Sequence, residues 1–298
     1  MMRVEWPTVA LTVITYGLWI VAGAALWPAY PVLALLLMTI CAAMHSSLVH
    51  ENLHGHPTRS RLLNEALVGV NLGLIWPYRR YRETHLKHHN DARLTDPFED
   101  PESYYKAAWH YRRMPAWLRG LLHVNNTLLG RMVLGPWLGG VAFLRAEARA
   151  IAADGPGVRL AWVLNLLGCL PVIVALVWWG IPVWLYVLVV VWGSLALISI
   201  RTFAEHRWHE TPDGRTLIVE RSPLSLLFLN NNLHVVHHKR PGAPWYRLAA
   251  LYREHRDEWL ALNQGYVYRN YWALFRAHAV HRKEPVEHPA LYRQGPQP

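Results

Sequence analysis

Two long stretches of this chain contain no lysine or arginine, and they limit the folds that it can adopt. The first runs from Val4 to Thr58 and the second from Leu160 to Ile200. Each stretch holds two apolar runs, and a helix of about 20 apolar residues spans the roughly 30 Å of a bilayer's hydrocarbon core. The sequence therefore predicts an all-α integral membrane protein with four transmembrane helices at about 8–27, 31–49, 160–179 and 182–200.

Short turns join these runs into two hairpins, and the distribution of basic residues predicts their orientation. The turns at 28–31 and 180–181 carry no basic residue. Arg3 and all other lysines and arginines lie outside the hairpins. By the positive-inside rule, both termini and the regions 50–159 and 201–298 are cytoplasmic, where they would form a helical cap. We expect one domain over residues 1–298, in the inner membrane of a bacterium.

A fifth span would change this topology. The stretch Leu121–Leu144 is long enough, but it carries His123 and Arg131 and several glycines. A second weak stretch, Ala66–Trp76, is too short to span a bilayer. We interpret both as interfacial or half-buried helices.

The chain carries a net charge of +10, with 30 lysine and arginine residues against 20 aspartate and glutamate residues. Such an excess suits either nucleic acid or an acidic membrane surface. Its confinement to the segments outside the hairpins favours the membrane, so we expect no nucleic-acid partner. With only two cysteines, Cys41 and Cys169, a cysteine-rich zinc site is excluded.

Histidines form three clusters, each at the cytoplasmic side of the predicted spans. The clusters are His50 and His54; His85, His88 and His89; and His234, His237 and His238. On a helix, residues i, i+3 and i+4 share a face, so each cluster directs its imidazoles to one side. Eight imidazoles exceed what one four-coordinate zinc uses, and they suit two transition metals such as iron. The sequence predicts a di-metal site in the cytoplasmic cap.

Other polar residues near these clusters are candidates for supporting roles. His206, just after the fourth run, is a candidate ninth ligand, with His209 as the alternative. Acidic residues following the second cluster could orient ligand imidazoles, although a solvated acidic loop is an equally good interpretation. They are Asp91, Asp96, Glu99, Asp100 and Glu102.

The first cluster also matches a different motif. His50-Glu51-x-x-His54 has the form H-E-x-x-H, in which two histidines bind zinc and the glutamate is the general base of a metalloprotease. That interpretation leaves the other six clustered histidines without a role. The membrane zinc protease is therefore an alternative hypothesis.

Taken together, the clusters resemble the three histidine boxes of the membrane fatty acid desaturase family. The order, the spacing and the paired hairpins are similar over about residues 10–255, and the first box resembles the acyl-lipid type. The resemblance implies a di-iron centre held by histidines, with a further histidine between the second and third boxes, where His206 stands. In acyl-CoA members an asparagine assists one iron through water, but Asn230, Asn231 and Asn232 cannot be matched to it.

The resemblance also implies a reaction and its partners. Removal of hydrogen from an unactivated methylene needs an oxidant that side chains cannot supply, so the metals and O₂ must supply it. We expect an acyl lipid as substrate, two iron ions as cofactor, and an external electron donor such as a ferredoxin. The chain contains no H-P-G-G haem-binding segment. A hydroxylase or carotenoid ketolase uses the same oxidant, and a metal transporter is a non-enzymatic alternative.

Overall fold

The computed structural model describes residues 4–89 and 91–290, except the side chain of Asp91, and is mostly helical. Its helices are α1 (Trp6–Val21), α2 (Pro31–Leu53), α3 (Arg61–Leu67), α4 (Tyr78–His88), α5 (Ala108–Arg113), α6 (Ala116–Asn125), α7 (Leu128–Ala152), α8 (Val158–Trp178), α9 (Val183–Leu185), α10 (Trp192–Glu205), α11 (His234–Lys239), α12 (Trp245–Glu254), α13 (Arg256–Leu262) and α14 (Tyr271–His278). Two short parallel strands, β1 (Ile218–Val219) and β2 (Val267–Tyr268), are the departure from an all-α fold.

The four predicted spans are confirmed as helices that are long and apolar enough to cross a membrane. They cover Trp6–Leu26, Pro31–Leu53, Val158–Trp178 and Val183–Glu205. Segments of π-helix at Ala22–Leu26 and Tyr186–Val191 belong to the first and fourth of them. The second and fourth helices continue past the predicted ends at residues 49 and 200. Their polar last turns are buried inside the protein, so the end of the apolar run does not end the helix.

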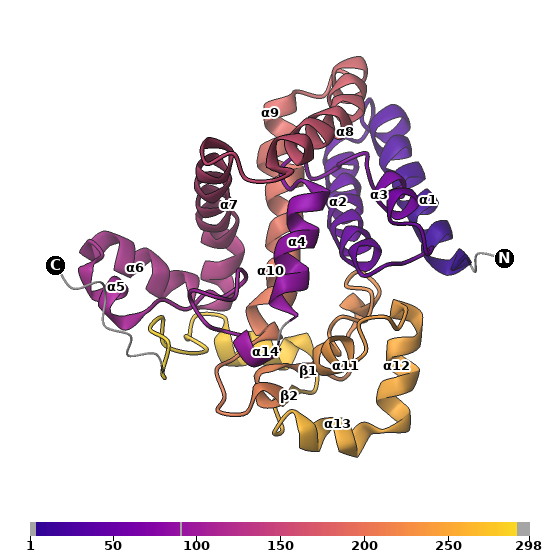
Figure 1. Cartoon of the computed structure of the whole chain (residues 1–298). Coiled ribbons are helices and arrows are strands. Elements are labelled where there is room, and N and C mark those ends of the chain that lie inside the picture. The colour runs from indigo at the N-terminus through magenta and orange to yellow at the C-terminus, as the bar shows by residue number, and fades with distance from the viewer. Residues whose placement is uncertain (1–3, 90, 291–298) are drawn as a thin grey trace.

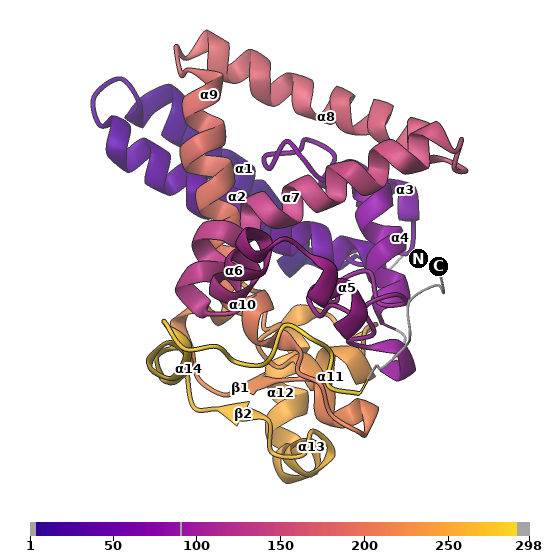
Figure 2. The same cartoon turned by 90° about the vertical axis from the view of Figure 1, so that its left-hand side faces the viewer.

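The two hairpin turns lie at one end of the molecule, and α11–α14 with both strands lie at the other (Figures 1 and 2). Helix α8 is steeply inclined to α10, so the second hairpin is open (Figure 2). The core near the turns is apolar, and its few polar groups are paired. Trp19 Nε1 donates to the Tyr186 hydroxyl at 3.0 Å, and that hydroxyl donates to the Leu72 carbonyl at 2.9 Å.

The two weaker apolar stretches have different outcomes. The prediction of a helix over Ala66–Trp76 is wrong beyond residue 67, because turns follow there. Asn71 stabilises these turns against α8, through its backbone N–H to the Gly168 carbonyl at 3.1 Å and its amide to Asn165 at 2.8 Å. The stretch Leu121–Leu144 is divided between α6 and α7. Neither helix is among the four candidate spans found in the described residues.

Candidate metal centre

Nine histidines converge at the end of the helices opposite to the hairpin turns, where they form two adjacent sets. The five-histidine set is His50, His54, His85, His89 and His237, and the four-histidine set is His88, His206, His234 and His238. Within each set, one ring nitrogen from every histidine lies within 4.8 Å of the others. The sets therefore contain all eight clustered histidines and the candidate ninth, His206.

Helical geometry explains why the clusters do not map one-to-one onto the sets. Residues i and i+4 lie roughly 40° apart around a helix, whereas i+3 lies roughly 60° to the other side of i. His85 on α4 and His89, which caps α4, join the five-histidine set, and His88 joins the other. On α11 the assignment is reversed: His234 and His238 join the four-histidine set, and His237 joins the five-histidine set. Each His-x-x-His-His segment thus faces both sets, rather than directing three imidazoles to one point.

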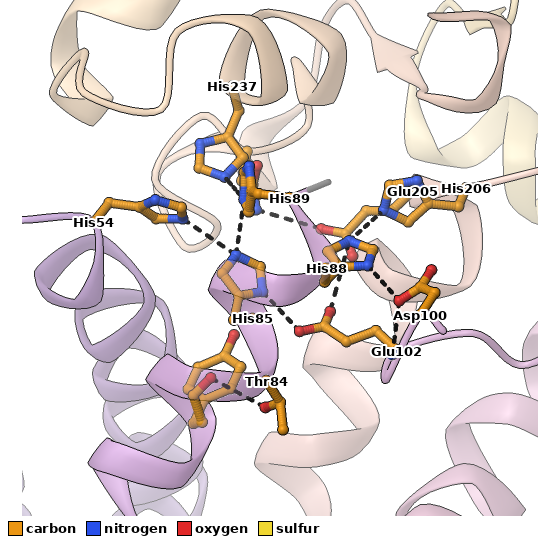
Figure 3. Close-up of polar contacts among 12 residues, drawn as sticks. His54, Thr84, His85, His88, His89, Asp100, Glu102, Glu205, His206 and His237 are labelled. Carbon is orange, nitrogen blue, oxygen red and sulfur yellow. Dashed lines mark hydrogen bonds and ion pairs between the residues drawn. The ribbon is translucent and has the colours of Figure 1, made fainter. Parts of the chain in front are cut away.

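The ring nitrogens of neighbouring histidines approach one another closely. In the five-histidine set, His85 Nε2 lies 3.1 Å from His54 Nε2 and 3.0 Å from His89 Nε2 (Figure 3). In the four-histidine set, His206 Nε2 lies 2.9 Å from His88 Nε2 and 3.0 Å from His234 Nε2. A neutral imidazole has one donor and one acceptor nitrogen, so such groups cannot all satisfy one another.

The donor set fits a metal in each position. His50 Nε2 is buried and has no hydrogen-bond partner among the described residues. A buried acceptor without a partner is costly, and a cation would satisfy it. Imidazole nitrogen is a good ligand for iron and other first-row transition metals.

Side-chain oxygen atoms hold the other ring nitrogen of three of these histidines. His85 Nδ1 lies 2.7 Å from Glu102 Oε1, and His88 Nδ1 lies 2.8 Å from Asp100 Oδ1 (Figure 3). Asn231 Oδ1 accepts from His234 Nδ1 at 2.9 Å. Such contacts set the tautomer and the orientation of a ligand imidazole.

Among the acidic side chains described after the second cluster, Asp100 and Glu102 are thus the two that contact candidate ligands. Asp96 instead accepts hydrogen bonds from the backbone N–H groups of Phe98 and Glu99. Glu99 forms an ion pair with Arg93. The side chain of Asp91 lies outside the described residues.

Burial keeps most of the candidate ligands neutral. It lowers the pKa values of His54, His206, His234 and His237 well below the ordinary value for histidine. His88 differs: burial lowers its pKa, but the carboxylates of Glu102, Asp100 and Glu205 together outweigh burial and raise the pKa to about 9. Metals bind the neutral imidazole, so a metal at His88 would compete with a proton.

Three other histidines lie outside both sets. His209 bonds to the Thr211 hydroxyl through Nδ1 at 2.9 Å and belongs to neither set, so the structure brings His206 to the centre instead. His45 Nε2 lies 3.1 Å from the Tyr16 hydroxyl inside the helical core. His56 Nδ1 pairs with Glu5 at 2.9 Å.

The sequence interpretation missed a buried ion pair beside the four-histidine set. Arg201 Nε lies 2.8 Å from Glu205 Oε1, and both side chains are at most 8% exposed. Glu205 Oε1 also lies 3.7 Å from His234 Nδ1. The sequence did contain a signal for this ion pair. Two opposite charges lie four residues apart at the end of an apolar run, next to a candidate ligand.

Comparison with known proteins identifies the family. A family model described as fatty acid desaturase matches residues 25–272, which include both candidate metal sets, the last three apolar helices and the end of the first. No curated protein sequence matches the chain significantly. Because the family match covers well over half of the chain, the chain belongs to the fatty acid desaturase family.

Proposed function

We propose that this protein is an O₂-dependent fatty acyl desaturase that introduces a double bond into an acyl chain at a histidine-bound di-iron centre. One observation carries the proposal: two adjacent sets of five and four imidazoles at one end of four apolar helices. The family supports desaturase or oxygenase chemistry, and the number of nitrogen ligands supports two metals rather than one.

The chain's own residues have three roles in this proposal. When bound, two irons would supply, together with O₂, the oxidising power that removes one hydrogen from each of two neighbouring methylene carbons. The nine histidines of the two sets would hold these irons. Asp100, Glu102 and Asn231 orient three of the imidazoles. Burial of the sets excludes water from the reacting carbons.

A cavity of about 280 Å³, whose lining includes Val49, the residue before His50, is the candidate site for part of the acyl chain. It lies between α2, α3 and α8, and its apolar lining includes Val49, Leu62 and Leu164. Leu62 is 70% exposed at its edge, as expected for a side chain that faces lipid. Arg79 and Glu65 pair at 2.7 Å and provide a polar lining for a lipid head group.

The proposal includes an orientation, a domain assignment and an electron donor. The absence of basic residues from both hairpins supports a cytoplasmic active site with both termini on the same side, in the inner membrane of a bacterium. Residues 1–298 act as one desaturase-like domain. Electrons come from a separate protein such as a ferredoxin, and the basic cytoplasmic segments would attract an acidic donor.

The zinc-protease alternative has weaker support because of the position of Glu51. A protease needs this glutamate beside the metal-bound water. Here, Glu51 Oε1 accepts from the Trp245 backbone N–H at 2.9 Å, and Glu51 groups with Glu5 and His56 instead of with His50. Transport also has less support, because the histidines gather at one end of the apolar helices rather than along a path through them.

Expression in a bacterial host, followed by mass spectrometry of its lipids, tests the proposed reaction. Cells that produce the protein should contain new double bonds, which should disappear in His88→Ala. His209→Ala is the matched control and should retain them, because His209 belongs to neither set. Hydroxylated or keto products would redirect the assignment to the related oxygenase reactions, and unchanged lipids beside an active electron donor would contradict it.

Replacing Asp100 by asparagine should weaken metal binding at His88 roughly 10- to 100-fold, the usual effect of losing a ligand's supporting partner. Both Asp100 oxygens accept, Oδ1 from His88 and Oδ2 from the Thr95 backbone N–H at 2.8 Å. The amide of asparagine would direct its own N–H donor at either His88 Nδ1 or the Thr95 N–H, so one of these two hydrogen bonds would be lost. Iron retained per chain against a chelator measures the effect, with Asp257→Asn, whose side chain is 96% exposed, as control. Equal retention in both variants would contradict this role.

A further inference from the structure

Residues 279–290, here called the C-terminal segment, follow α14 and lie beyond the residues matched by the family model. The segment crosses the lower half of the molecule from α14 toward α5 (Figure 2). It has little regular structure, yet Val286 is only 5% exposed and His288 only 6%. Burial of an irregular segment indicates that specific contacts hold it in place.

The segment first contacts the backbone of His206. Lys283 Nζ donates to the His206 carbonyl. The Tyr104 hydroxyl lies 2.8 Å both from that carbonyl and from Glu284 Oε2. Tyr105 donates to the same Glu284 carboxylate. The segment thus supplies the Lys283 amino group and the Glu284 carboxyl group to a network that surrounds one backbone carbonyl.

His206 needs such support more than the other candidate ligands do. It follows the last residue of α10 and has extended backbone angles, φ −127° and ψ 145°. Its neighbours in the four-histidine set include His234 and His238, which lie on α11, and His88, which lies on α4. A helix holds its side chains through its own backbone hydrogen bonds, whereas an extended residue depends on tertiary contacts. A short bridge to Thr216 is one such contact, and Lys283 provides another.

The segment makes its second contact with the loop that carries Asp100. The Lys106 N–H donates to the Val286 carbonyl at 2.9 Å, and the His288 N–H donates to the Lys106 carbonyl at 2.9 Å. His288 Nε2 also lies 3.3 Å from the Thr95 hydroxyl. Both ends of the loop 95–106 are therefore attached to the segment.

Both contacts reach the four-histidine set, and the attached loop also reaches His85 of the five-histidine set through Glu102. Asp100, in the attached loop, holds His88 at 2.8 Å, and the Thr95 N–H donates to the other oxygen of Asp100. His88 Nε2 and His206 Nε2 lie 2.9 Å apart. The five-histidine set, by contrast, takes its members from α2, α4 and α11 and the residues that cap them.

We propose that the C-terminal segment is a positioning element for the four-histidine set, which holds His206 and His88 at the spacing that a metal requires. Lys283 and Glu284 are its positioning residues, and they act through His206 rather than on the substrate. The inference rests on the proposed two-metal centre. It implies that metal binding at one of the two positions depends on residues that lie outside the family match.

Titration of the metal-free, full-length protein with Co²⁺ in detergent tests this inference. The unmodified protein should bind two ions. Lys283→Met and Glu284→Gln should each bind one of them roughly 10- to 100-fold more weakly and leave the other unchanged. The weakened ion should be the one that is also lost in His234→Ala, because His234 belongs to the four-histidine set. Arg282→Met, at the adjacent exposed position, is the control and should bind both ions normally.

Two further measurements separate positioning from general stability. The melting temperature of the metal-free Lys283→Met protein should match that of the control, and Lys283→Arg should restore part of the lost affinity. Two ions bound with normal affinity in both variants would overturn the inference while leaving the proposed function intact. Equal weakening of both ions would also overturn it. Fewer than two ions in the unmodified protein would instead contradict the proposed function.

Discussion

A protein in which His237 is replaced by alanine is expected to form no detectable product and to lose metal from the five-histidine set. His237 Nε2 lies 3.1 Å from His89 Nε2, and the His237 ring packs 4.8 Å from that of His50. The substitution removes a metal ligand itself. The loss of activity should therefore exceed the roughly 10- to 100-fold loss that follows removal of a ligand's supporting partner. Iron per chain and double bonds in the host's lipids measure the two effects.

The His237→Ala variant also discriminates between a di-iron desaturase and a zinc protease. In the desaturase, His50→Ala and His237→Ala should have similar effects, because both residues belong to one set although they lie in different clusters. A zinc protease would need only His50, Glu51 and His54. A single zinc per chain that is lost in His50→Ala but retained in His237→Ala would therefore refute the di-iron assignment. His209→Ala controls for the loss of a histidine as such.

Replacing Arg201 by methionine should lower the free energy of unfolding by about 3–5 kcal/mol, the cost of leaving one member of a buried ion pair without its partner. Arg201 and Glu205 have side chains only 6% and 8% exposed, so water cannot replace the lost guanidinium. A loss of this size is a large part of the total stability of most domains. Denaturant titration in detergent micelles measures it.

Two comparisons make this prediction specific. Arg159→Met removes a partner from Asp154 in a pair whose side chains are 67% and 78% exposed, so it should change stability little. The double variant Arg201→Met with Glu205→Leu should recover much of the loss, because it removes both buried charges. A single variant as stable as the Arg159→Met control would show that the pair contributes nothing.

Much of the fold could be predicted from the sequence because the relevant signals are local. The absence of lysine and arginine over residues 4–58 and 160–200 indicated the four apolar helices, and all four are present. Their ends were less predictable. Helices α2 and α10 extend into polar turns that carry His50 and Glu205, because the surrounding protein buries those turns. Hydropathy alone cannot detect such tertiary burial.

The histidines of the candidate centre could be selected from the sequence, but their grouping could not. Spacing on one helix gives the relative directions of His85, His88 and His89, and says nothing about which neighbouring helix each one faces. The division into sets of five and four depends on where α2, α4 and α11 lie relative to one another. Tertiary structure also decided between His206 and His209 as the ninth ligand, because the direction of His206 depends on the extended backbone after α10.

The sequence by itself determined the membrane character of the chain and the residue types of its centre, because both follow from composition and from periodicity along single helices. Only the tertiary structure decided how these residues are shared between two positions and what supports them. Lys283 reaches His206 across 77 residues of sequence, and Arg201 is buried beside Glu205 among packed helices. Contacts of this kind arise from the packing of distant segments, which no local pattern encodes.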